Sequence, residues 1–68
     1  MIIKHNGFLI NQEHCDFIEV CGELIIYQFS YGSRSLIYKD AMAAYKKIEE
    51  GIKNGVDFVD VSEFAKKE

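Results

Sequence analysis

Apolar and polar side chains alternate over much of the first half of the chain, with the period of two that is typical of a β-strand. The clearest example is the segment Glu23–Tyr31. Two sets of side chains point to its opposite faces, namely Ile25, Tyr27, Phe29 and Tyr31 on one face and Leu24, Ile26, Gln28 and Ser30 on the other. Because this segment is apolar on both faces, we expect it to be the longest strand and the centre of a sheet.

Short turns separate this segment from further strands on either side. Asn6-Gly7 lies between two apolar runs, and such a pair favours a type I′ hairpin turn with positive φ at both residues. Gly22 and Gly32 mark the next two turns. The sequence therefore predicts an antiparallel meander of about five strands, which are Ile2–His5, Phe8–Asn11, Asp16–Val20, Glu23–Tyr31 and Arg34–Lys39.

A helical period replaces the alternation at Asp40, which is a favourable N-cap residue. Gly51 weakens the expected helix by up to ~1 kcal/mol relative to alanine, and Asn54-Gly55 is a natural left-handed stop. Residues 56–61 predict a short strand at an edge, and residues 62–68 fit either a frayed helical turn capped by Ser62 or a simple tail. The apolar positions at helical spacing are Ala41, Ala44, Tyr45, Ile48 and Ile52.

Together these elements predict one small α+β domain over residues 1–68. It consists of a small antiparallel β-sheet, a meander of about five strands, with one helix packed on one face and a short C-terminal strand. Small residues in the first helical turn let the helix approach the aromatic face of the central strand, and they are Ala41, Ala43 and Ala44 opposite Tyr27, Phe29 and Tyr31. A single helix covers only one face of the sheet.

The other face of the sheet is the strongest indication of function. Leu24, Ile26 and Ile37 alternate with the aromatic set, and Ile18 and Val20 join them if the register allows. A contiguous apolar face on a single sheet has to be covered by the chain's own end, by a second copy or by another protein. We therefore predict a non-enzymatic protein–protein interaction module, either a homodimer or a small inhibitor of a host protein, with these five residues as the partner-binding set.

Charge and composition change this interpretation little. The chain of 68 residues has eight Lys and Arg against eleven Asp and Glu, a net charge of −3, and lacks the basic excess of a duplex-binding protein. Hydrophobic residues make up 49% of the chain, which excludes disorder. The start has no signal-peptide pattern and the apolar runs are too short for a membrane span. With two cysteines, these features favour a reducing, cytoplasmic location.

The segment Gln12–Cys21 carries the residue types that chemistry requires, with one histidine, both cysteines and three carboxylates. A cysteine nucleophile needs a base within hydrogen-bond reach. In an extended strand His14 and Cys15 point to opposite faces, and His14 shares its face with Asp16. We therefore interpret Cys15 and Cys21 as small, partly buried hydrophobic residues.

Two alternatives use the same sulfur atoms. A zinc ion would take His5, His14, Cys15 and Cys21, but the histidines are nine residues apart and the cysteines six, wider than the tight pairs of structural zinc sites. A Cys15–Cys21 disulfide fits across a turn but is disfavoured in a reducing compartment.

Two polar or aromatic features complete the search for a site. The Gly32-Ser33 turn with Arg34, the only arginine, fits either a solvated loop or a site for phosphate or carboxylate. Tyr27, Tyr31, Tyr38 and Tyr45 fit either core packing or stacking of bases. Neither feature matches a catalytic, cofactor or metal motif, so we predict no enzyme, no cofactor and no metal.

The order of elements over residues 16–53, three strands followed by a helix, resembles the small DNA-binding domains of some phage integrases, which lay the sheet in the major groove. The resemblance implies a nucleic-acid-binding accessory domain as the alternative function, with Lys4, Arg34, Lys39 and exposed tyrosines at the interface. Short, cysteine-poor α+β chains of this kind are also typical of proteins encoded by phages and mobile elements.

Overall fold

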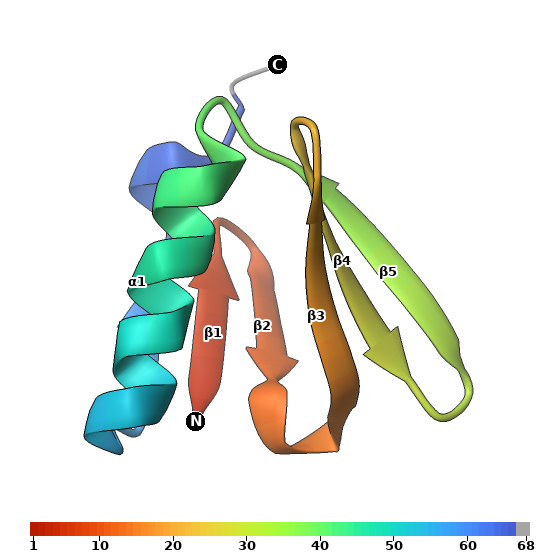
Figure 1. The fold of residues 1–68 in the computed structure, drawn as a ribbon, viewed down its shortest axis with the longest axis vertical. Coiled ribbons are helices and arrows are strands. Elements are labelled where there is room, and N and C mark those ends of the chain that lie inside the picture. The colour runs from red at the N-terminus through yellow and green to blue at the C-terminus, as the bar shows by residue number, and fades with distance from the viewer. Residues whose placement is uncertain (67–68) are drawn as a thin grey trace.

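A computed structural model describes residues 1–66 of the chain, and the expected α+β class is confirmed. In Figure 1, β1 and β2 appear between α1 on one side and β3, β4 and β5 on the other. The strands are β1 (Ile2–His5), β2 (Phe8–Asn11), β3 (Cys15–Cys21), β4 (Leu24–Phe29), β5 (Gly32–Ile37) and β6 (Phe58–Asp60), the helix is α1 (Ala41–Asn54), and two 3₁₀ turns, η1 and η2, cover Gln12–His14 and Ser62–Phe64.

The strands form two three-stranded sheets rather than one continuous meander. The first sheet has the order β2-β1-β6 and the second the order β3-β4-β5. The break falls at η1, where the Asn11 side chain accepts a hydrogen bond from the Glu13 N–H and turns the chain. The short C-terminal strand β6 lies at a sheet edge, as expected, but it pairs parallel to β1.

The central position of β4 is confirmed, but β4 is not the longest strand. It has six residues, whereas β3 has seven. The hairpin between β1 and β2 also forms as expected, with His5 opposite Phe8. Its turn is not type I′, because φ is 50° at Asn6 but is not positive at Gly7.

Helix α1 begins and ends where the sequence predicts. The Asp40 side chain accepts a hydrogen bond from the Ala43 N–H at 3.1 Å, which satisfies one of the free donors of the first turn. Gly55 has a φ of 68°, and its N–H donates to the carbonyls of Gly51 and Ile52. Both ends are therefore closed by short-range contacts of the kind that a sequence pattern encodes.

One hydrophobic core joins both sheets and the helix, because the inner faces of all three point toward one another. In its centre the Tyr27 and Tyr38 hydroxyls form a hydrogen bond of 2.7 Å. Tyr31 lies outside this core, 85% exposed in the β4–β5 turn, and stacks on Phe29 instead of meeting the helix. The buried members are Ile3, Ile10, Ile25, Tyr27, Leu36, Tyr38, Ala41, Ala44, Ile48, Val59 and Val61.

The end of the described chain returns to β5. Tyr38 and Ala65 form an antiparallel bridge, and the Lys66 N–H donates to the Ile37 carbonyl at 3.3 Å. These bonds pair backbone groups at the C-terminal end of the free edge of β5. The same groups are therefore not available for pairing with a strand of another chain.

The segment after β6 forms a helical turn, η2, but Ser62 does not cap it as expected. The Ser62 hydroxyl instead accepts a hydrogen bond of 2.7 Å from the Asn6 N–H, which ties the C-terminal segment to the first hairpin. The rest of the expected tail, Lys67 and Glu68, lies outside the described residues.

Gly51 is the position at which α1 comes close to the first sheet. A Cβ atom at Gly51 would lie 2.6 Å from the Cγ2 atom of Val59 and 3.1 Å from the Sδ atom of Met1. Ile52, which the helical spacing assigns to the buried face, is 46% exposed. The buried stripe of α1 therefore follows Ala41, Ala44, Ile48 and Gly51.

This close approach predicts that Gly51→Ala destabilises the protein, although alanine is the better helix former. The gain in helix propensity is up to ~1 kcal/mol, while overpacking a stiff valine costs about 1–3 kcal/mol. Chemical denaturation should show a net loss of about 1 kcal/mol. Gly7→Ala is the matched control, since a Cβ atom at Gly7 meets nothing within 4 Å. A stabilised Gly51→Ala protein would contradict the predicted contact.

Candidate functional site

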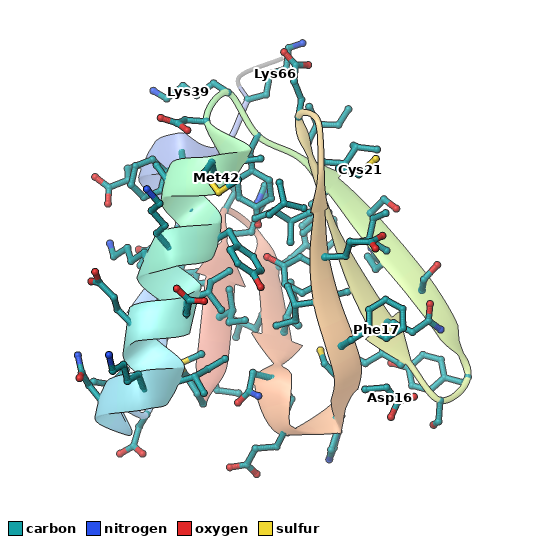
Figure 2. All side chains as sticks on the ribbon, viewed as in Figure 1. Asp16, Phe17, Cys21, Lys39, Met42 and Lys66 are labelled. Atoms are coloured by element: carbon teal, nitrogen blue, oxygen red, sulfur yellow. The ribbon has the colours of Figure 1, made fainter. Side chains whose placement is uncertain are left out.

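The outer face of the β3-β4-β5 sheet points away from the core. Residues directly opposite one another on neighbouring strands share a face, so the register defines a grid with three side chains from each strand. These are Phe17, Glu19 and Cys21 of β3, Gln28, Ile26 and Leu24 of β4, and Ser33, Ser35 and Ile37 of β5. Figure 2 shows Phe17 and Cys21 pointing away from α1.

The apolar side chains of this grid adjoin one another. Leu24 lies opposite Ile37 and two residues from Ile26 on the same strand. Phe17 lies opposite Gln28, which makes Ile26 its diagonal neighbour, within reach of an aromatic ring. Phe17 is 52% exposed and Ile37 is 49% exposed. We call Phe17, Leu24, Ile26 and Ile37 the outer patch.

Ile18 and Val20 do not belong to the outer patch. Ile18 lies opposite Tyr27 and Val20 lies opposite Ile25, so both side chains lie on the inner face. Both are half-buried and pack against the core. Of the five residues expected on the uncovered face, the register brings Leu24, Ile26 and Ile37 together there.

Phe17 is the member of the outer patch that sequence reasoning missed. The register shifts between Cys15 and Phe17, where a β-bulge interrupts the pairing of β3 with β4. The alternation of Phe17 and Glu19 against Ile18 and Val20 was the available signal. The alternation shows that one of these two pairs faces outward, but the strand register determines which pair it is.

The grid of the outer face carries one charged side chain, Glu19, and no cation. The three basic residues that a nucleic-acid interface would use lie outside this grid. Lys4 pairs with Leu9 in the first sheet, Arg34 lies over the Phe8 ring with 4.5 Å between the guanidinium carbon and the ring centroid, and Lys39 follows β5. The structure does not gather these cations on one surface.

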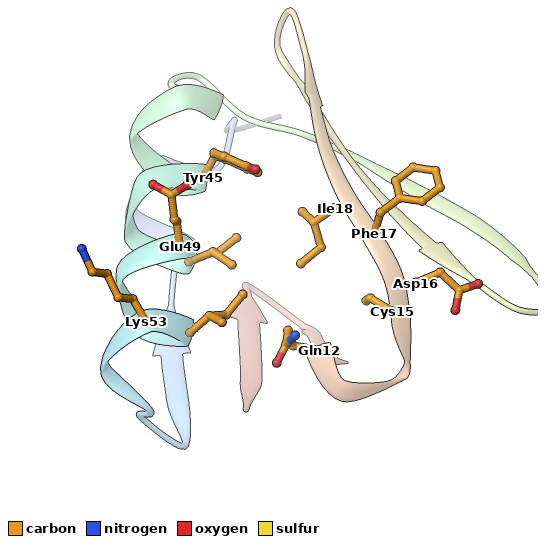
Figure 3. Close-up of a pocket in the computed structure, with 10 residues that line it drawn as sticks. Gln12, Cys15, Asp16, Phe17, Ile18, Tyr45, Glu49 and Lys53 are labelled. Atoms are coloured by element: carbon orange, nitrogen blue, oxygen red, sulfur yellow. The ribbon is translucent and has the colours of Figure 1, made fainter.

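A groove of about 390 Å³ runs between α1 and the edge strand β3. Figure 3 shows helical side chains along one wall, β3 side chains along the other and Gln12 near one end. Ile48 and Ile52 give the helical wall an apolar surface, while Glu49 and Lys53 lie at its rim. The groove is a surface with room for a partner in addition to the outer face of the sheet.

Cys15 lies in this groove but lacks the environment of a nucleophile. Its Sγ atom is 3.8 Å from the Asn11 carbonyl oxygen, to which it donates. Burial, reinforced by the negative charge of Asp16, raises the pKa of the Cys15 thiol, so the thiol stays protonated at neutral pH. Cys21, a free thiol like Cys15, lies on the outer face of the sheet. Over residues 1–66, no three His, Cys, Asp or Glu side chains come together as a metal site.

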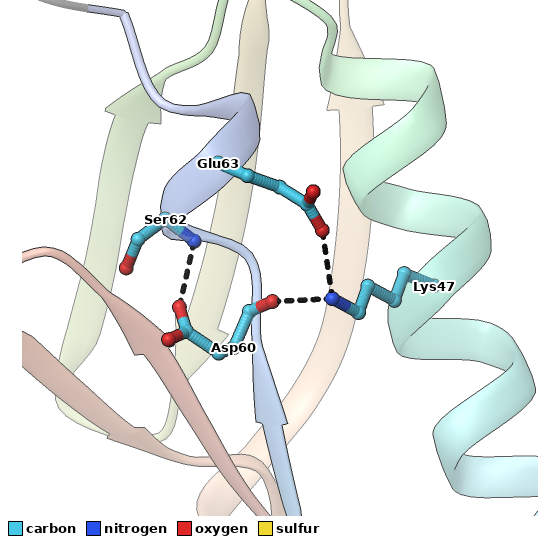
Figure 4. Close-up of polar contacts among 4 residues, drawn as sticks. All are labelled: Lys47, Asp60, Ser62 and Glu63. Carbon is cyan, nitrogen blue, oxygen red and sulfur yellow. Dashed lines mark hydrogen bonds and ion pairs between the residues drawn. The ribbon is translucent and has the colours of Figure 1, made fainter.

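A polar cluster on the other side of α1 has a structural role. The Lys47 ammonium group donates to the Asp60 carbonyl at 2.8 Å and to the Glu63 carboxylate at 2.9 Å, and the Ser62 N–H donates to the Asp60 carboxylate (Figure 4). The Lys47 and Glu63 side chains are largely exposed, so the ion pair stabilises the fold little. The cluster links α1 to β6 and η2 through exposed polar contacts.

Among the described residues, His5 is the one buried side chain with a polar atom that has no hydrogen-bond partner. Its Nδ1 atom is buried without a hydrogen bond, and its ring meets the Tyr38 ring edge-on with 4.6 Å between the centroids. Burial lowers the pKa of His5 and raises the pKa of both Tyr27 and Tyr38. All three side chains are therefore neutral at pH 7.

Comparison of the chain with protein-family models, with curated proteins and with solved structures found no match. Within the described part of the chain, no helix has both the length and the apolar character that a membrane crossing requires.

The buried His5 predicts that stability falls as the solution becomes mildly acidic. Its folded-state pKa lies below the value of about 6.5 in an unfolded chain, so the unfolded state binds more protons as the pH falls through about 6.5. The free energy of unfolding should therefore decrease from about pH 7 to about pH 5.

Urea denaturation across this pH range measures the effect. His5→Leu should reduce the pH dependence, while His14→Leu, at an exposed position, should preserve most of it. The same pH dependence in the His5→Leu protein as in the wild type would contradict the assignment to His5.

Proposed function

We propose that this protein is a non-enzymatic interaction module that forms a homodimer through the outer patch. The observation that supports the proposal is the contiguous, half-exposed apolar surface of Phe17, Leu24, Ile26 and Ile37, over which the described chain folds no segment of its own. A second copy offers the same apolar surface, and a two-fold axis lets identical patches meet. The other occupant consistent with this surface is a larger host protein that the chain inhibits.

The size of the patch predicts a weak dimer. Three strands at a spacing of about 4.8 Å and six residues at about 3.4 Å each make a face of about 14 by 20 Å. Such a face falls below the ~800 Å² per partner of a standard interface. We therefore expect a dissociation constant in the micromolar range.

The cytoplasm is the proposed location. Cys15 and Cys21 are both free thiols, which suits a reducing compartment. The raised pKa of the Cys15 thiol supports a protein that works by binding rather than by covalent chemistry.

Ile26→Glu tests the proposal because Ile26 lies in the central strand of the patch. In a dimer the charge would be desolvated against a second apolar patch, so the variant should be a folded monomer. Circular dichroism and size-exclusion chromatography with light scattering, run on the same sample, measure fold and mass together.

Leu9→Glu is the matched control, since Leu9 is 69% exposed and belongs to the other sheet. It should remain folded and dimeric. An Ile26→Glu protein that still dimerises like the wild type would contradict the proposed interface. An unfolded Ile26→Glu protein would show that Ile26 belongs to a core that the monomer needs, which would also contradict it.

A further inference from the structure

The free edge of β3 is a second surface suited to a partner. In the order β3-β4-β5, β3 pairs with β4 alone, so alternate backbone N–H and C=O groups of β3 point away from the sheet. Over residues 1–66, no backbone group of Phe17–Cys21 bonds to a segment other than β4. The bulge between Cys15 and Phe17 limits regular pairing to these five residues.

The groove between α1 and β3 lies beside this edge. A strand added to β3 would point alternate side chains inward, next to Ile18 of β3 and toward Ile48 and Ile52 of α1. The volume of about 390 Å³ is within the range of pockets that hold small ligands, and it suits a few apolar side chains. The edge offers hydrogen bonds and the groove offers apolar contact, and an extended peptide uses both.

The charged side chains around the free edge of β3 favour a partner strand that carries basic residues. Asp16 and Glu19 are the charged residues of β3, and Glu49 lies at the rim of the groove, where, among the described residues, Lys53 is the only cation. Pairing of β3 with β3 of a second copy would bring carboxylates from both strands together without a cation, and this is unfavourable. A strand with lysine or arginine on its outward face would instead pair with Glu19.

We propose that the edge of β3 binds an extended, basic segment of another protein by β-strand addition. Apolar side chains of that segment enter the groove beside α1, and its lysine or arginine side chains lie next to Glu19. This surface adjoins the outer patch at Glu19, which lies on the outer face, but the pairing itself uses the free edge of β3 and the groove on the inner side. The protein would then join its own second copy through one surface and a basic partner through the other.

The test uses two capped seven-residue peptides, one of alternating valine and lysine and one of alternating valine and glutamate. Titration of each into the full chain, followed by amide NMR shifts, should show that the lysine peptide perturbs Phe17–Cys21 and the groove side of α1. The glutamate peptide should bind about fivefold more weakly. Methylation of the backbone nitrogens along the edge of the lysine peptide that pairs with β3 should remove the hydrogen bonds of strand addition and abolish binding.

Glu19→Lys provides the charge reversal, and its exposed position leaves the core unchanged. The variant should prefer the glutamate peptide. Equal binding of both peptides, shifts confined to other surfaces, or no shifts at millimolar peptide would each overturn the proposal. The same titration on an Ile37→Glu protein separates strand addition from dimerisation, because Ile37 belongs to the outer patch but lies on β5, two strands away from the free edge of β3.

Discussion

A single helix of fourteen residues has to cover the inner faces of two three-stranded sheets, and the rest of the structure depends on this constraint. The helix meets it by lying close to its neighbours. Gly51 lets α1 approach Val59 without a side chain between them, and Ala41 and Ala44 are fully buried in the first turns. Tyr27 and Tyr38 fill the remaining space with large rings, and their mutual hydrogen bond satisfies both hydroxyls in the core.

The same constraint leaves the outer side of the second sheet without cover. Each strand of an antiparallel sheet presents alternate side chains to opposite faces, so β4 must place Leu24 and Ile26 outside when Ile25 and Tyr27 point inward. The described residues contain no second α-helix that could lie over them. The apolar outer patch and the open edge of β3 therefore arise from one cause, and both lead us to propose association with other chains.

Local signals in the sequence predicted the parts of the fold that local contacts determine. The Asp40 cap, the Gly55 stop, the hairpin at Asn6 and the central strand are all present, because each depends on residues close together in the chain. The division into two sheets and the parallel pairing of β6 with β1 depend on contacts between distant segments. Periodicity alone contains no information on such contacts.

The candidate site was predictable to a similar extent. Leu24, Ile26 and Ile37 follow from alternation along two strands. Whether Phe17 or Ile18 joins them depends on a bulge of one residue in β3, and a shift of one residue reverses every side chain of a strand. The groove beside α1 does not follow from the sequence pattern, since it requires the packing of α1 against β3, an edge strand that ends twenty residues before the helix begins.

Sedimentation equilibrium of the wild-type chain tests most directly whether the uncovered sheet face is an interface. Over a range of about 1 to 100 μM, the average mass should rise from that of the 7.8 kDa monomer toward twice that value, as a micromolar dissociation constant requires. A mass that stays at 7.8 kDa over the whole range would contradict self-association through the outer patch.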